Sequence, residues 1–186
     1  MNLRQLPNAI TVARMLLVPL LLWCLHVGDY RAALWIALVA GFSDALDGWL
    51  AKRFGWQTWL GGVLDPIADK LLLDASFVGL WMGGGAPGWL AALVVGRDAV
   101  IVAGASAYHF MVGPLEGNPT LLSKATTVAQ IALVLALLFG LAWRPLPQDL
   151  SIVAVWLVAA LTFASGIDYV VRWSLRAHRA LRARRQ

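Results

Sequence analysis

The sequence has few cysteines, few histidines and few charged residues. It contains one cysteine and three histidines among 186 residues, and only 13% of its residues are Asp, Glu, Lys or Arg. The single thiol, Cys24, excludes an intrachain disulfide, and its apolar surroundings favour packing as a small hydrophobic side chain. His26, His109 and His178 are scattered along the chain, which argues against a histidine metal site.

Apolar residues, in contrast, are abundant. Hydrophobic residues make up 60% of the chain and include ten tryptophans, and the mean hydropathy is +0.72. A soluble domain of this length has too little interior to bury so much apolar surface, so the composition predicts an integral membrane protein. Because the first apolar run lacks a small-residue cleavage site, we expect a membrane span there rather than a cleavable signal.

Six apolar runs are each about 20 residues long, which is enough to cross the hydrocarbon region as a helix. They cover approximately residues 8–27, 31–53, 59–82, 88–112, 121–143 and 150–173. Glycine and proline separate them, and no long linker, low-complexity block or clear repeat interrupts the series. The prediction is an all-α integral membrane protein with six transmembrane helices, built as a single domain over residues 1–186.

Basic residues predict the orientation of these spans. The last fifteen residues hold six arginines, and Arg4, Lys52, Arg53 and Lys124 would lie on the same side, against Arg31 and Arg144 on the other. Because Lys and Arg mark the cytoplasmic side, we expect cytoplasmic termini, a basic cytoplasmic tail from about residue 174, and a site facing the cytoplasm from the plasma (inner) membrane. A nucleic-acid-binding tail is disfavoured, since basic residues beside a span ordinarily contact anionic lipid.

Four aspartates lie inside apolar runs: Asp44, Asp47, Asp65 and Asp69. Charged side chains at membrane depth are costly, so such a cluster indicates a functional site. Asp44 and Asp47 are spaced i, i+3, and Asp65 and Asp69 are spaced i, i+4, so each pair shares one face of a helix. Two such faces turned toward each other would offer four carboxylates, which are ligands suited to hard divalent cations such as Mg2+.

Depth along the spans favours a shared site. With a rise of about 1.5 Å per residue, both pairs lie roughly 9–15 Å from the cytoplasmic ends of their helices. Arg14 comes out at a similar depth of about 9 Å. Two interpretations of Arg14 stay open: a clamp for a substrate phosphate, and a counter-ion for Asp44 or Asp47.

The aspartates belong to a longer motif that resembles the CDP-alcohol phosphatidyltransferase family. The family signature is Asp-x2-Asp-Gly-x2-Ala-Arg-x8-Gly-x3-Asp-x3-Asp. In this chain its positions are Asp44, Asp47, Gly48, Ala51, Lys52, Gly61, Asp65 and Asp69. Every spacing matches, and the one departure is Lys52 where the family has arginine. Lysine keeps the charge but lacks the planar guanidinium fork, so Arg53 is a candidate to share the role.

The resemblance implies an enzyme that transfers a phosphatidyl group from CDP-diacylglycerol to an alcohol and releases CMP. It implies that the four aspartates hold two divalent cations, Mg2+ or Mn2+, and that Asp69 is the general base for the acceptor hydroxyl. The residues implied to bind CDP-diacylglycerol are Gly48, Ala51, Lys52, Arg53 and Gly61. Family members often dimerise through membrane helices, so the resemblance leaves a homodimer open.

Other segments bear on the acceptor. Segments 6–14 and 65–70 resemble both cardiolipin synthases and phosphatidylglycerophosphate synthases of this family, whereas segments 96–98 and 119–130 resemble the former more. The expected acceptor is therefore phosphatidylglycerol, which gives cardiolipin, with glycerol 3-phosphate, which gives phosphatidylglycerophosphate, as the alternative. The expected phosphate or acceptor contacts are Asn8, Thr11, Arg14, Lys124 and Thr127.

Three further hypotheses come from the residues themselves. Ionisable residues in spans also mark ion or proton transporters, although no inverted repeat is obvious here. Asp74 and Arg97 fall at equal depth, and we expect them to pair because buried charges need partners. Ser123, Thr127 and Gln130 form a polar stripe on one helical face, which predicts either the acceptor entrance or a hydrogen-bonding seam between helices.

Overall fold

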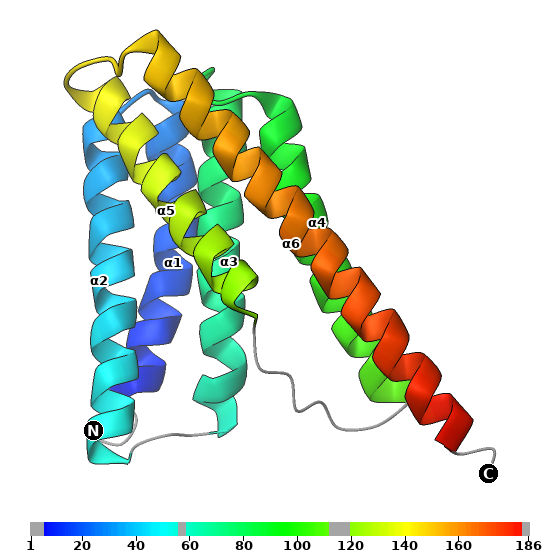
Figure 1. The fold of residues 1–186 in the computed structure, drawn as a ribbon. Helices are drawn as coiled ribbons and strands as arrows, with labels where there is room; N and C mark the ends of the chain where they lie inside the picture. The colour runs from blue at the N-terminus through cyan, green and yellow to red at the C-terminus, as the bar shows by residue number, and fades with distance from the viewer. Residues whose placement is uncertain (1–5, 56–58, 112–119, 184–186) are drawn as a thin grey trace.

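Six helices run alternately up and down in the computed structural model, which describes residues 6–55, 59–111 and 120–183 (Figure 1). They are α1 Leu6–His26, α2 Tyr30–Phe54, α3 Trp59–Met82, α4 Gly88–Met111, α5 Leu121–Ala142 and α6 Gln148–Ala183. Side chains are described for residues 9–49, 53–55, 67–106 and 120–175. The six predicted helices are confirmed, except that α6 continues to Ala183 rather than ending near residue 173.

Local sequence signals explain where the helices turn. Between α1 and α2, Gly28 adopts a positive φ of 77°, a conformation that glycine reaches without steric cost. Asp29 then caps α2, because its Oδ1 accepts a hydrogen bond from the Ala32 backbone N–H at 3.0 Å. The Thr120 hydroxyl caps α5 in the same way by accepting from the Ser123 N–H at 3.1 Å. A short capped turn between α1 and α2 places these neighbours antiparallel.

The helices pack as two groups, which are joined by α5 and by the packing of α3 against α4. α1 packs against both α2 and α3, α4 packs against α6, and α5 contacts α2 and α6. α2 and α3 touch each other little, so α1 is the element that holds them together. In Figure 1, α4 and α6 diverge from α1–α3 toward the end of the bundle where α1 begins and α6 ends.

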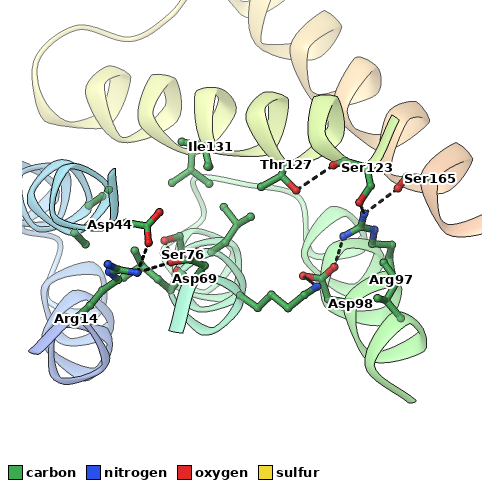
Figure 2. Close-up of a pocket in the computed structure, with 18 of the residues that line it drawn as sticks. Arg14, Asp44, Asp69, Ser76, Arg97, Asp98, Ser123, Thr127, Ile131 and Ser165 are labelled. Atoms are coloured by element: carbon green, nitrogen blue, oxygen red, sulfur yellow. Dashed lines mark hydrogen bonds and ion pairs between the residues drawn. The ribbon is translucent and has the colours of Figure 1, made fainter. Parts of the chain in front are cut away.

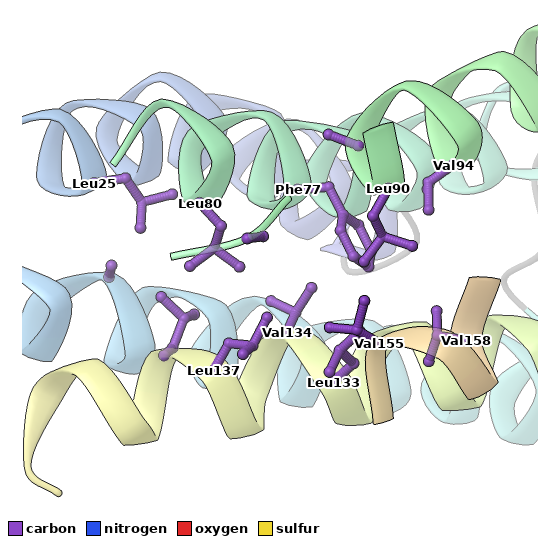
Figure 3. Close-up of a cluster of buried hydrophobic side chains, with 14 of the residues drawn as sticks. Leu25, Phe77, Leu80, Leu90, Val94, Leu133, Val134, Leu137, Val155 and Val158 are labelled. Atoms are coloured by element: carbon purple, nitrogen blue, oxygen red, sulfur yellow. The ribbon is translucent and has the colours of Figure 1, made fainter. Parts of the chain in front are cut away.

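The apolar core fills the opposite end, where the helices converge. Figure 3 shows its side chains in two facing layers, one from α1, α3 and α4 and the other from α2, α5 and α6. Phe77, Leu80, Leu90 and Leu138 are fully buried there. Inside a membrane, such side chains hold helices together mainly through close van der Waals packing. The polar residues of the aspartate-bearing half are thereby left toward the diverging end.

The surface of the bundle is that of a membrane protein. Within the described residues, four helical stretches are long and apolar enough to cross a membrane: Ala9–His26, Gly88–Ser106, Leu121–Ala142 and Gln148–Leu175. Large apolar side chains point outward over the helices, among them Leu16, Phe42, Val128 and Trp156. A surface of this kind suits lipid rather than water. The expected multi-pass membrane class is supported.

Candidate active site

Arg14 lies at the centre of a group of carboxylates (Figure 2). Its Nη1 is 2.6 Å from Asp44 Oδ1 and 2.6 Å from Asp69 Oδ1. Its Nη2 is 2.6 Å from Asp47 Oδ2. The arginine side chain is fully buried. We call these four residues, Arg14, Asp44, Asp47 and Asp69, the Arg14 cluster.

Helix geometry and packing bring the cluster together. Asp44 and Asp47 lie one turn apart on α2 and face the same side, while Asp69 comes from α3. Because α1 packs against both of these helices, Arg14 can reach all three carboxylates. The side chain of Asp47 is only 3% exposed, whereas those of Asp44 and Asp69 are 41% and 47% exposed. Two carboxylates are therefore accessible and the third is enclosed by protein.

The counter-ion interpretation of Arg14 is confirmed, since the guanidinium pairs with both Asp44 and Asp47. The third pair, with Asp69, was not predicted. A guanidinium stays charged when buried and presents a planar fork of donors, so it can serve several carboxylates at once. Arg14 thus joins α1, α2 and α3 through ionic contacts.

The donor chemistry of the Arg14 cluster suits hard divalent cations. Carboxylate oxygens are the ligands that Mg2+ and Mn2+ prefer. Within the described residues, the positive charge among these oxygens is the Arg14 guanidinium, and no group of three or more His, Cys, Asp or Glu side chains is arranged as a metal site. The fourth aspartate, Asp65, lies in α3 with its side chain outside the described residues. The cluster thus fits divalent cations by the chemistry of its carboxylate ligands, while its described geometry is that of carboxylates paired with Arg14.

A cavity of about 1120 Å³ adjoins the Arg14 cluster and is lined by residues of all six helices. Arg14, Asp44 and Asp69 line one side of it. Apolar side chains such as Leu38 and Ile131 also line it. The cavity is slightly larger than most small-molecule sites, which measure roughly 300–1,000 Å³. Its mixed lining suits an amphipathic molecule with an anionic head.

A second charged group, which we call the Arg97 cluster, lines the other side of the cavity (Figure 2). Its members are Lys70, Arg97, Asp98, Ser123 and Ser165. Arg97 Nη1 pairs with Asp98 Oδ1, and Arg97 Nη2 donates to Ser123 Oγ and Ser165 Oγ, each at 2.8 Å. Lys70 Nζ lies 2.8 Å from Asp98 Oδ2. The cluster therefore links α3, α4, α5 and α6.

The predicted pair between Asp74 and Arg97 is wrong. Arg97 binds Asp98 and two serines instead, and the buried Asp74 Oδ1 has no hydrogen-bond partner among the described residues. Equal depth along two helices did not produce a pair, because depth does not fix the direction in which each side chain points around its helix.

The polar stripe of α5 divides between the two predicted roles. Ser123 and Thr127 line the cavity. Gln130 is buried, and its Nε2 donates to Thr162 Oγ1 of α6 at 3.0 Å, which makes it part of a helix–helix seam. Lys124 is exposed and is not among the cavity-lining residues that the structure describes.

The other expected binding residues are described only in part. The side chains of Asn8, Ala51, Lys52, Gly61, His109, His178 and the basic tail beyond residue 175 lie outside the described residues. A Cβ added at Gly48 would meet no atom within 4 Å, so space is open beside it. Arg53 is exposed and Thr11 is fully buried.

Sequence reasoning missed Ser165 of α6, whose Oγ accepts a hydrogen bond from Arg97 Nη2 at 2.8 Å. The available signal was helical spacing. Thr162, Ser165 and Asp168 recur every three residues in an otherwise apolar segment, and such a stripe predicts one polar face. That face meets the cavity through Ser165 and Asp168.

Comparison with known proteins agrees with the motif. Residues 4–164 match the profile of the family described as CDP-alcohol phosphatidyltransferase. A match over this much of the chain establishes that the protein belongs to the CDP-alcohol phosphatidyltransferase family. Membership of this family supports a transferase of phospholipid biosynthesis, and the expectation drawn from the aspartate motif is confirmed.

Curated relatives carry two kinds of name. The chain is 34% identical to the cardiolipin synthase (CMP-forming) / mitochondrial hydrolase fusion protein of Schizosaccharomyces pombe, over 91% of this chain and 31% of that protein. It is 33% identical to a probable phosphatidylglycerophosphate synthase of Mycobacterium tuberculosis, over 92% of this chain and 82% of that protein. It is 31% identical to the CDP-diacylglycerol–glycerol-3-phosphate 3-phosphatidyltransferase of Bacillus subtilis, over 89% of this chain and 93% of that protein.

Proposed function

We propose that the protein transfers a phosphatidyl group from CDP-diacylglycerol to phosphatidylglycerol, giving cardiolipin and CMP. The observation that carries this proposal is the position of Asp44 and Asp69 on the wall of a large cavity with both charged and apolar lining. Acidic side chains there can act on a phosphate-bearing head while apolar walls accept the lipid part. The family and the relatives support the same reaction class.

Asp44, Asp47, Asp65 and Asp69 would hold two divalent cations, Mg2+ or Mn2+. When bound, such cations neutralise the charge that grows on the departing CMP oxygen. The chain's own part is to bring carboxylates from α2 and α3 together, which it does through Arg14 and the packing of α1.

Asp69 is the proposed general base. Its side chain is 47% exposed and lines the cavity, so a hydroxyl bound in the cavity can reach it. Asp69 takes the proton of that hydroxyl, whose oxygen forms a bond to the phosphorus that carries diacylglycerol. The bond from this phosphorus to the CMP oxygen breaks, and CMP leaves with the electron pair.

The remaining assignments concern substrate contacts. We place CDP-diacylglycerol against Gly48, Ala51, Lys52, Arg53 and Gly61, supported by the open space beside Gly48. For the phosphate and acceptor we retain Asn8, Thr11, Arg14, Lys124 and Thr127, of which Arg14 and Thr127 line the cavity. Lysine at position 52 would hold a phosphate as a point charge rather than through a two-pronged contact.

A second acceptor, glycerol 3-phosphate, is favoured by a specific observation. Two bacterial relatives, of which this chain covers 82% and 93%, are named for the synthesis of phosphatidylglycerophosphate or for transfer to glycerol 3-phosphate. Both candidate acceptors present a glycerol hydroxyl and a phosphate, so the same base and the same cavity would serve either one.

The proposed setting is the inner membrane, with six spans, both termini in the cytoplasm and the site facing the cytoplasm. Support comes from the even number of antiparallel helices, which puts the start of α1 and the end of α6 at one end of the bundle (Figure 1). The positive-inside bias then assigns that end to the cytoplasm. A homodimer is included on the family resemblance alone.

Product analysis tests the proposal. Purified protein in liposomes receives CDP-diacylglycerol and Mg2+ with either phosphatidylglycerol or glycerol 3-phosphate, and mass spectrometry identifies the lipid formed while CMP is quantified. Cardiolipin with equimolar CMP is the expected result. Phosphatidylglycerophosphate would transfer the assignment to the second acceptor. Cation flux across the liposome without CMP release would overturn the transferase proposal in favour of a transporter.

A further inference from the structure

The Arg14 cluster has an unusual charge balance. One guanidinium contacts three carboxylates, so the described cluster holds an excess of two negative charges. Both terminal nitrogens of Arg14 are used in these contacts, and the side chain is fully buried. Three carboxylates this close repel each other unless a positive charge lies among them. Arg14 supplies that charge from within the chain.

The atoms that Arg14 contacts are also the atoms that a divalent cation needs. Oxygens of Asp44, Asp47 and Asp69 each lie 2.6 Å from a guanidinium nitrogen. A cation bound to these carboxylates therefore shares them with a positive charge that cannot be neutralised by losing a proton. Like charges at such separation repel strongly where water is scarce.

We propose that Arg14 is a resident counter-cation: it holds the carboxylates of α2 and α3 together before divalent cations bind, and it weakens the binding of those cations. This inference rests on the proposed cation-dependent function of the same site. Arg14 is a positioning residue, since it acts through the carboxylates. The chemical class concerned is a hard divalent cation, and the property assigned to Arg14 is control of its affinity.

Direct cation binding tests the inference. Free Mn2+ is measured by electron paramagnetic resonance during titration of protein that has been purified in detergent and treated with EDTA, with no lipid substrate present. Arg14→Gln removes the charge and is expected to bind Mn2+ about tenfold tighter than the native protein. Arg14→Lys keeps the charge and is expected to stay within about threefold of the native Kd.

Thermal unfolding without cations supplies the second readout. Arg14→Gln is expected to unfold at a lower temperature than the native protein and to gain more stability from added Mn2+. Arg31→Gln is the matched control, because Arg31 is exposed at the other end of α2 and donates to the Ala142 carbonyl at 3.2 Å. Its Mn2+ affinity should equal the native value.

Unchanged or weaker Mn2+ binding by Arg14→Gln would overturn the inference, as would a Lys variant that binds as tightly as the Gln variant. If Arg14→Gln does not fold, the native protein answers the question through ¹⁵N-labelled arginine. Mg2+ should shift the guanidinium resonance that Arg14→Lys abolishes and leave that of Arg31 in place. No shift would contradict the inference.

The outcome is separable from that of the proposed function. If the protein releases CMP and makes a lipid product, but its Mn2+ affinity does not change when Arg14 is replaced, only this inference is refuted. If Arg14→Gln binds Mn2+ more tightly but the native protein transfers to neither acceptor, the role of Arg14 as a counter-cation stands and the proposed reaction is refuted.

Discussion

Two buried arginines organise opposite sides of the same cavity, and their surroundings differ in charge. Arg14 lies among three carboxylates. Arg97, together with Lys70, contacts the single carboxylate of Asp98, and its other contacts are serine hydroxyls. Asp74 lies within electrostatic reach of Lys70, Arg97 and Asp98, which brings that region to balance.

The difference teaches where chemistry is to be expected. A balanced group at membrane depth satisfies its own charges and can serve as a link between helices. A group with surplus negative charge has to recruit positive charge from outside, and such sites are retained for function. The Arg14 cluster is of the second kind, and the Arg97 cluster taken together with Asp74 is of the first kind, although both contain a buried arginine.

The largest expected effect is at Asp69. Asp69→Asn removes the base while keeping the size of the side chain, and turnover should fall by about 10²–10⁴-fold. Binding of Mn2+ and of CDP-diacylglycerol should be largely retained, as measured by titration. Asp149→Asn, an exposed aspartate in the first turn of α6, is the control and should keep native turnover. Near-native turnover in Asp69→Asn would refute the assignment of the base.

The next effect separates cation binding from proton transfer. Asp44→Ala removes a carboxylate that is accessible from the cavity, and the Mg2+ concentration for half-maximal activity should rise by at least about tenfold. Mg2+ titration of CMP release measures it. A variant with reduced turnover but a native Mg2+ requirement would remove Asp44 from the proposed ligands.

Replacing Arg97 should reduce stability and leave the cation requirement unchanged. Arg97→Met breaks a buried ion pair and leaves two serines without their donor, which should cost about 3 kcal/mol of unfolding free energy. Unfolding in detergent measures the loss. At a temperature where the variant is folded, its Mg2+ requirement should match that of the native protein. A changed requirement would mean that the two clusters are functionally coupled, and the contrast drawn between them would fail.

The smallest effect is expected at the rim of the cavity. Arg172 and Asp168 form an i, i+4 pair at 2.6 Å, and the arginine side chain is 57% exposed. Arg172→Gln should therefore change the unfolding free energy by less than about 0.5 kcal/mol. The same unfolding assay measures this change beside that of Arg97→Met. If Arg172→Gln loses as much unfolding free energy as Arg97→Met, the exposed fraction of an arginine side chain does not predict how much it contributes to stability.

The sequence predicted much of the fold because membrane helices have strong signals. Runs of apolar residues separated by Gly and Pro gave the six helices, and the boundaries of α3 agree with the prediction at both ends. Only α6 runs further than hydropathy indicated, because a helix can continue beyond the membrane into a basic segment whose residues favour helix.

The sequence could predict how far along its helix each site residue lies, but not which neighbours its side chain contacts. Spacing and depth placed Arg14 level with Asp44 and Asp47, and that prediction holds. Depth does not fix the direction in which a side chain points around its helix, which is why Asp74 was paired with Arg97 incorrectly. Ser165 carries no charge, so its role as an acceptor for Arg97 becomes visible only when α4 and α6 are placed side by side.

The accessibility of Asp69 has a cost for the enzyme proposed here. A base that lines a cavity of about 1120 Å³ meets any hydroxyl that enters, including that of water, and water would convert CDP-diacylglycerol to phosphatidic acid. CDP-diacylglycerol itself takes up part of this volume, with its headgroup and part of its chains. Water is therefore kept from Asp69 only where donor and acceptor together fill the cavity around this carboxylate.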